Sequence, residues 1–276
     1  MDKKISFSDW LIASDIDGTL NNKLRRLPKR NEAAIKKFVS MGGRFTLASG
    51  RNPQSMEKHF RRLPIAVTPA VVINGAGIYD FQKNEMIYFS AMSDEGMRLA
   101  IEAAKKFPMV DVIIVAKDII YITGSGWFGR FFVANDSLDH KHIRNISDVP
   151  KEDWGKVIFS GLPMHITKVR KHFESMTDPD LTLMSSSVAS FEILARNTHK
   201  GTAVLKLAEI LGIDKSHTGA IGDYFNDFDM LKTVGVPACC GQAPKELKDI
   251  SEFVACHCNK GAVADFLEYI EKKENK

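Results

Sequence analysis

Two aspartates follow the first predicted strand at a spacing that lets them share one small volume. Asp15 and Asp17 come directly after the apolar run Leu11–Ser14, in the stretch Ser14-Asp15-Ile16-Asp17-Gly18-Thr19-Leu20. Residues two apart on a strand point the same way, so the carboxylates would repel each other unless a cation is present or one keeps its proton. Gly18 would let the chain turn away sharply. An ordinary strand-end turn also contains Asp and Gly, so this stretch alone leaves both interpretations open.

A second acidic segment favours the interpretation as a site. Ile221-Gly222-Asp223-Tyr224-Phe225-Asn226-Asp227 also follows a predicted strand and precedes a predicted helix. In an open parallel sheet, residues just past the carboxyl ends of the strands converge on one crevice. Asp15, Asp17 and Asp223 would there form a hard-oxygen site that suits Mg²⁺, with water filling the remaining positions.

Two further polar residues lie at the ends of predicted elements. Ser49 ends the second predicted strand, where its hydroxyl and nearby amides could bind a phosphate oxygen. Lys200 precedes a helix and is a cation of the kind that neutralises a transferring phosphoryl group. Turn chemistry alone does not account for a polar group at each of these termini.

The elements that would position these groups alternate between strand and helix near both ends of the chain. In the middle, strands instead come in pairs, as in an α+β domain with antiparallel hairpins. We predict a doubly wound, parallel-sheet (Rossmann-like) α/β core from residues 1–81 and 195–276, and an inserted α+β cap domain at 82–194. The predicted core strands are Leu11–Ser14, Phe45–Ala48, Val71–Ile73, Thr218–Ile221 and Val236–Cys240.

Four segments resemble, in order, the motifs of the haloacid dehalogenase superfamily. They are Asp15-Ile16-Asp17-Gly18-Thr19, Ser49-Gly50-Arg51, Lys200-Gly201 and Gly222-Asp223-x-x-Asn226-Asp227. Asn74-Gly75-Ala76 also resembles the Cof-type branch, which carries a type IIB cap between the second and third motifs. The resemblance spans nearly the whole chain and implies a magnesium-dependent phosphohydrolase that works through an aspartyl-phosphate intermediate.

The resemblance also implies a role for each matching residue. Asp15 would be the nucleophile and a magnesium ligand, and Asp17 the general acid and then the general base, with its backbone carbonyl touching the metal. Ser49, Gly50 and Lys200 would hold the phosphoryl oxygens, and Asp223 would complete the metal site. The supporting residues would be Thr19, Asn74, Asn226 and Asp227.

The predicted function is hydrolysis of a small phosphorylated metabolite, either a sugar phosphate or a phosphorylated cofactor. The segments Cys239–Ala243 and Cys256–Gly261 depart from the usual pattern of the branch, so the subfamily and the substrate stay open. One alternative is a sugar phosphomutase of the same superfamily, which would release an isomer instead of phosphate. Another is a non-catalytic sugar-phosphate-sensing protein, which would release neither.

Composition and the remaining motifs argue against other classes of protein. The net charge of +4 is too small and dispersed to indicate nucleic-acid binding. Apolar runs fall short of the roughly 18–20 residues of a membrane helix, and the N-terminus lacks the apolar stretch of a signal peptide. We therefore expect a cytoplasmic protein without membrane, nucleic-acid or obligate protein partners.

Two further patterns are weak evidence for a zinc site and for a dinucleotide-binding site. Cys239-Cys240 and Cys256-His257-Cys258 are spaced too closely for structural zinc, so buried thiols are favoured. The stretch Gly124–Gly129 fits the dinucleotide pattern G-x-G-x-x-G but lacks its expected context, so a cap loop is favoured.

Overall fold

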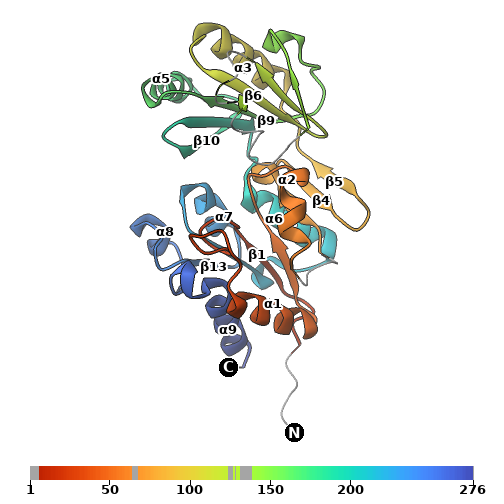
Figure 1. Cartoon of the computed structure of the whole chain (residues 1–276). Coiled ribbons are helices and arrows are strands. Elements are labelled where there is room, and N and C mark those ends of the chain that lie inside the picture. Colours follow the sequence, from red (N-terminus) through yellow and green to blue (C-terminus); the bar gives the residue numbers. More distant parts are fainter. Residues whose placement is uncertain (1–5, 64–67, 124–126, 128, 131–138, 276) are drawn as a thin grey trace.

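A parallel sheet lies at the centre of the core and carries the segments that begin and end the chain. The computed structural model describes residues 6–63, 68–123, 127, 129–130 and 139–275 (Figure 1). Within these residues the parallel sheet has the order β14-β13-β12-β1-β2. Its strands are β1 (Leu11–Ser14), β2 (Arg44–Leu47), β12 (Thr218–Gly222), β13 (Val236–Cys239) and β14 (Phe253–Val254). The strands β1 and β12, which short apolar runs predict, are buried on both faces, as expected of parallel strands covered by helices.

Helices cover both faces of this sheet. Ile12 packs in one apolar cluster with residues of α1 (Lys29–Ser40) and α9 (Ala262–Glu274). Its neighbours Leu11 and Ala13 point the other way and pack with α6 (Lys200–Leu211) and α7 (Phe228–Thr233). The alternation along β1 thus places helices on each side, and the predicted doubly wound core is confirmed. Two smaller helices complete the core, α2 (Pro53–Phe60) and α8 (Lys245–Asp249).

A small antiparallel sheet extends the core beyond β2. It has the order β3-β4-β5, with strands β3 (Ala70–Val72), β4 (Gly77–Asp80) and β5 (Glu85–Phe89). A parallel bridge between Ala48 and Val71 joins it to the end of β2. The predicted cap range of 82–194 therefore includes a strand, β5, that pairs with the core side of the chain. The domain boundaries themselves stay a prediction.

The middle of the chain forms the second layered unit. Its sheet has the order β10-β11-β9-β6-β7-β8 and is antiparallel except for the pair β7 and β8. The helices α3 (Asp94–Lys106) and α5 (Pro163–Glu174) pack on one face of it, and Figure 1 shows the opposite face turned toward the core. The strands are β6 (Asp111–Ala116), β7 (Ile120–Thr123), β8 (His140–His142), β9 (Trp154–Ser160), β10 (Leu181–Ser187) and β11 (Ser190–Ala195). We call this unit, from α3 to β11, the cap.

Short 3-10 turns connect several of these elements. They are η1 (Ile73–Gly75), η2 (Ile146–Asp148), η3 (Lys215–His217), η4 (Phe225–Asp227) and η5 (Cys258–Lys260). Of the predicted cap loop at Gly124–Gly129, residues 124–126 and 128 lie outside the described residues. Among the residues that are described, no helix is long and apolar enough to cross a membrane.

Candidate active site

Three carboxylates meet at the carboxyl ends of two neighbouring strands. Asp15 follows β1 and Asp223 follows β12, and the Asp15 backbone N–H still donates to the Ile221 carbonyl at 3.0 Å. Oxygens of Asp15, Asp223 and Asp227 lie within 4.8 Å of one another. The rule that parallel strands converge at their carboxyl ends thus places Asp15 and Asp223 together, as the sequence pattern predicts.

Lys200 lies between two of these carboxylates. Lys200 is the first residue of α6, and its Nζ donates to Asp15 Oδ1 and to Asp227 Oδ1, both at 2.7 Å. The Lys200 and Asp227 side chains are entirely buried. Burial disfavours the Lys200 cation, but the two carboxylates outweigh that effect and raise its pKa above the ordinary value. Lys200 therefore stays charged, and its single charge only partly neutralises the acidic cluster.

Burial, together with the remaining negative charge, raises the pKa values of two of the carboxyl groups. Burial raises the pKa of Asp15 to about 7. The Lys200 charge lowers this pKa and the Asp227 carboxylate raises it, but burial is the largest effect. Burial, followed by repulsion from Asp227, raises the pKa of Asp223 to about 6. Crowded carboxylates of this kind are stabilised in their charged form by a nearby cation.

The loop that carries Asp223 is held by a side chain of its own turn and by one from the segment that follows β1. Asp227 Oδ2 accepts from the backbone N–H groups of Asp223 at 3.0 Å and of Tyr224 at 3.4 Å. Thr19 Oγ1 donates to Asp223 Oδ1 at 3.3 Å. Asn226 lies in the same turn and is partly buried.

Gln242 is a supporting residue that the sequence pattern did not identify. Its Nε2 donates to the Gly18 carbonyl at 2.6 Å and lies 3.5 Å from Asp223 Oδ2. Its Oε1 accepts from the Cys258 backbone N–H at 3.0 Å. The only available signal was its place in the Cys239–Ala243 segment, which departs from the usual pattern of the Cof-type branch.

The Asp17 side chain is not part of the carboxylate cluster and pairs instead with an arginine. Arg51 Nη2 donates to Asp17 Oδ2 at 2.8 Å, and the Asp17 side chain is 46% exposed. The expectation that the Asp15 and Asp17 side chains share one volume assumed that strand alternation continues past Ser14. The strand ends there, and Gly18 has a positive φ of 83°, so the chain is already turning. Asp227 stands in the carboxylate cluster instead.

Ser49, Gly50 and Asn74 lie together beyond β2 and β3. Ser49 is buried, and its carbonyl accepts from the Asn74 backbone N–H at 3.0 Å. A Cβ atom on Gly50 would lie only 2.6 Å from Asn74 Oδ1, so a larger residue does not fit there. Two of the predicted phosphate-binding residues, Ser49 and Gly50, thus form a compact loop pair with the predicted supporting residue Asn74, next to the end of β1.

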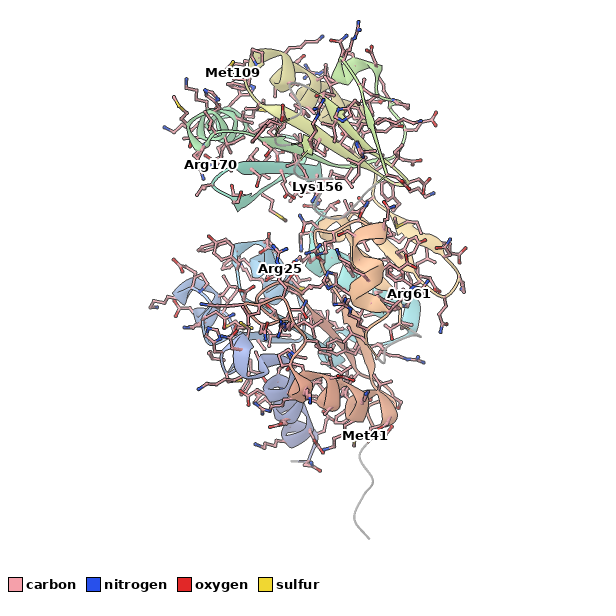
Figure 2. The ribbon with its side chains drawn as sticks, in the orientation of Figure 1. Arg25, Met41, Arg61, Met109, Lys156 and Arg170 are labelled. Carbon is pink, nitrogen blue, oxygen red and sulfur yellow. The ribbon has the colours of Figure 1, made fainter. Side chains whose placement is uncertain are left out.

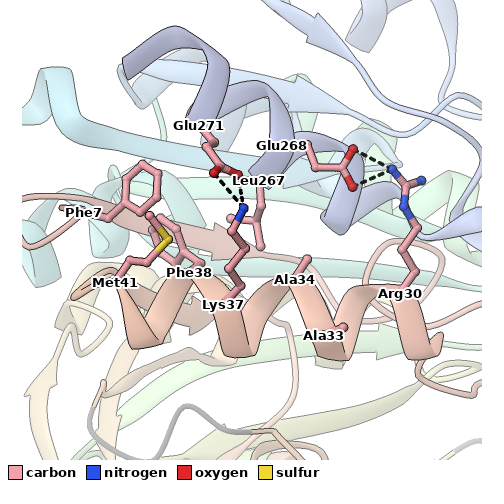
Figure 3. A pocket seen from close by; sticks show the side chains of 10 residues that line it. All are labelled: Phe7, Arg30, Ala33, Ala34, Lys37, Phe38, Met41, Leu267, Glu268 and Glu271. Carbon is pink, nitrogen blue, oxygen red and sulfur yellow. Dashed lines mark hydrogen bonds and ion pairs between the residues drawn. The ribbon is translucent and has the colours of Figure 1, made fainter. Parts of the chain in front are cut away.

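A separate surface pocket lies between α1 and α9, on the side of the core away from the cap (Figures 1 and 3). Apolar side chains, among them Phe38 and Leu267, line it, and the ion pair of Lys37 with Glu271 crosses it. The acidic cluster is not among the residues of this pocket. It is therefore distinct from the candidate active site.

Known proteins resemble this chain over almost its full length. Residues 12–267 match the family of haloacid dehalogenase-like hydrolases. The chain is 25% identical over 287 residues to phosphatase YwpJ of Bacillus subtilis (strain 168), which covers 94% of this chain and 99% of that protein. It is 26% identical over 283 residues to 5-amino-6-(5-phospho-D-ribitylamino)uracil phosphatase YwtE of the same strain, with 94% and 97% covered.

A solved structure shares the complete architecture. The haloacid dehalogenase subclass IIB sugar phosphatase BT4131 has a TM-score of 0.80 to this chain at 18% sequence identity. The match covers 95% of this chain and 99% of that one. The core and the cap therefore occur together in the same fold.

Proposed function

The chain belongs to the family of haloacid dehalogenase-like hydrolases, and on that basis we propose that it hydrolyses phosphate monoesters of small metabolites through a phosphoryl group held on Asp15. The observation that carries the proposal is the Asp15 carboxylate, buried at the end of β1 and fixed by Lys200 at 2.7 Å. A carboxylate held in one position is suited to attack phosphorus, because orientation is fixed before the reaction begins.

The proposed reaction uses two neighbouring aspartates in different roles. An Asp15 oxygen forms a bond to phosphorus as the bond from phosphorus to the leaving oxygen breaks, and Asp17 donates a proton to that oxygen. Asp17 then takes a proton from water, the water oxygen attacks phosphorus, and Asp15 is regenerated as phosphate leaves. Arg51 holds Asp17 in place from the side. Ser49, Gly50 and Lys200 would bind the phosphoryl oxygens.

The acidic cluster fits a divalent magnesium ion. Its donors are all carboxylate oxygens, the ligand type that Mg²⁺ prefers, and Asp15 and Asp223 both have raised pKa values despite the nearby Lys200 cation. Asp15 and Asp223 would hold the ion, together with the Asp17 backbone carbonyl, because both Asp227 oxygens are already bonded, Oδ1 to Lys200 and Oδ2 to backbone N–H groups. The bound ion would reduce the repulsion between the attacking carboxylate and the phosphate dianion.

We propose that the substrate is a sugar phosphate or a phosphorylated cofactor. The relatives support this range, because one is named for a phosphorylated ribitylaminouracil and a protein of the same fold is named a sugar phosphatase. The cap sheet turns one face toward the core, so side chains on that face are in a position to contact the part of the substrate beyond the phosphate.

A metabolite screen tests the proposal. Purified protein is incubated with phosphorylated sugars and cofactors, with Mg²⁺ or with excess chelator, and inorganic phosphate is measured. Magnesium-dependent phosphate release that is lost in Asp15→Asn supports the proposal. Release of an isomer without phosphate would indicate a mutase, and no turnover of any compound would contradict a catalytic function.

A further inference from the structure

We propose that Lys156 and Glu192, two cap residues, are positioning residues that hold the phosphate-binding loop of the core. The inference rests on the proposed function, since it assigns a task to Ser49 and Gly50. Lys156 lies on β9 and Glu192 on β11, and their side chains form an ion pair of 3.0 Å with exposures of 3% and 7%. Figure 2 shows Lys156 on the side of the cap sheet that faces the core.

Each member of this ion pair also bonds to a different core loop. Lys156 Nζ donates to the Gly50 carbonyl at 3.1 Å. Glu192 Oε2 accepts from Asn74 Nδ2 at 2.7 Å. The two loops are bonded to each other, because the Asn74 N–H donates to the carbonyl of Ser49, the residue before Gly50, so the ion pair and the two loops form one closed network. The cap is thus fastened to the same loop pair that would bind the phosphoryl group.

The loop that Glu192 holds has an unusual backbone. Ile73 and Asn74 have positive φ values of 53° and 54°. Such angles are rare for a β-branched residue and persist only where surrounding contacts enforce them. The Asn74 N–H donates to the Ser49 carbonyl at 3.0 Å, and the Asn74 side chain bonds to Glu192. Removing Glu192 takes away one of the contacts that keep this loop in place beside Gly50.

Stability alone is a weak reason for a buried ion pair at this position. Two charges lose their hydration on burial, and an apolar pair of similar size often stabilises a fold as well or better. Charged groups, however, give directed bonds to a carbonyl and to an amide, which apolar side chains do not. A connection between core and cap also contacts the Asn74 loop, since the Ser90 N–H donates to the Ala76 carbonyl at 2.7 Å and the Ser90 and Thr198 hydroxyls are 2.9 Å apart. The position of the cap is therefore coupled to the position of the phosphate loop.

The test uses full-length variants and a control from another contact between cap and core. Lys156→Met removes the donor to Gly50, and Lys156→Met/Glu192→Met replaces the whole pair by apolar side chains. Gln54→Ala is the control, because Gln54 makes two exposed hydrogen bonds to Asp139, at 2.9 and 3.2 Å. The variants are compared by urea unfolding, by kcat and KM on a metabolite and on p-nitrophenyl phosphate, and by hydrogen exchange of residues 48–52 and 73–76.

We expect the double variant to be as stable as the wild type but to lose about 10- to 100-fold in kcat, since a displacement near 1 Å costs about that much. The loss should be equal within about threefold for both substrates, because both use the same phosphate loop, and exchange in the two loops should rise. Gln54→Ala should change neither readout. Wild-type kcat in the stable double variant, unchanged loop exchange, or a loss confined to the metabolite would each overturn the proposal. If the wild type hydrolyses nothing, the proposed function fails, while hydrogen exchange still decides whether the pair holds the loops.

Discussion

Replacing Lys200 by Met tests whether the acidic cluster depends on one internal cation. The Lys200 side chain has no exposed surface, and it bonds to both Asp15 and Asp227. Methionine keeps most of the apolar stem and removes the charge. Asp15 and Asp227 then remain buried without a neutralising partner, and Asp223 lies within the same cluster.

The expected cost follows from the burial of these groups. Removing one partner of a buried ion pair typically costs about 3–5 kcal/mol, and here two carboxylates lose their partner at once. We therefore expect Lys200→Met to lower the free energy of unfolding by about 5 kcal/mol at pH 8 without Mg²⁺. Lys206→Met is the matched control, because Lys206 lies on the same helix but is 40% exposed and pairs with Glu209 on the surface. It should change stability by less than about 0.5 kcal/mol.

The pH dependence gives the sharper test. Burial already raises the pKa of Asp15 to about 7 with Lys200 present, and loss of the cation should raise it further. A carboxyl group with a raised pKa binds more protons in the folded state, so its contribution to stability falls as pH rises from near 4 through the folded pKa. The variant should therefore lose less stability at pH 5 than at pH 8 in urea unfolding. A loss below about 1 kcal/mol at pH 8, or an equal loss at both pH values, would refute this account of the cluster.

Three further predictions concern the metal and the two aspartates. Excess chelator should abolish phosphate release and added Mg²⁺ should restore it, so full activity in chelator would contradict the shared metal site. Gly18→Ala should raise the Mg²⁺ concentration for half-maximal activity at least about 10-fold, because the new Cβ would lie 2.4 Å from Asp223 Oδ2. Gly212→Ala is the control, because Gly212 also has a positive φ but has open space around it, and this substitution should leave that Mg²⁺ concentration unchanged. Asp17→Asn should release a burst of nitrophenol from p-nitrophenyl phosphate and accumulate a phosphoprotein by rapid quench and intact mass, whereas Asp15→Asn should give neither. A phosphoprotein that never forms in Asp17→Asn with any substrate would favour direct attack by water.

The core could be predicted from sequence because local patterns determine it. The apolar run Leu11–Ser14 is a buried parallel strand, and polar residues that directly follow parallel strands meet at one edge of the sheet. The same reasoning did not anticipate that β5 pairs with β4. The residues of β5 are exposed or only partly buried, so its hydrophobic pattern carries little information about which sheet it joins.

The contacts that hold the site are less predictable because they are made between distant segments. Gly50 and Lys156 are 106 residues apart, and Asn74 and Glu192 are 118 apart. No local spacing relates such pairs, and a charged residue inside a strand is normally expected to face solvent. The role of Gln242 is equally hard to predict from sequence, since its partner Gly18 lies 224 residues away.

Asp15 and Asp17 are neighbours in sequence but lie in environments that suit opposite tasks. The Asp15 side chain is 9% exposed and bonded to Lys200, so its position is fixed and its exchange of protons with solvent is restricted. The Asp17 side chain is 46% exposed and is held from one side by Arg51. Nucleophilic attack requires a fixed oxygen, whereas general acid–base catalysis requires a group that regains its proton in every turnover. With the roles exchanged, a buried group would have to exchange a proton with water in each cycle, so burial supports Asp15 as nucleophile and Asp17 as acid and base.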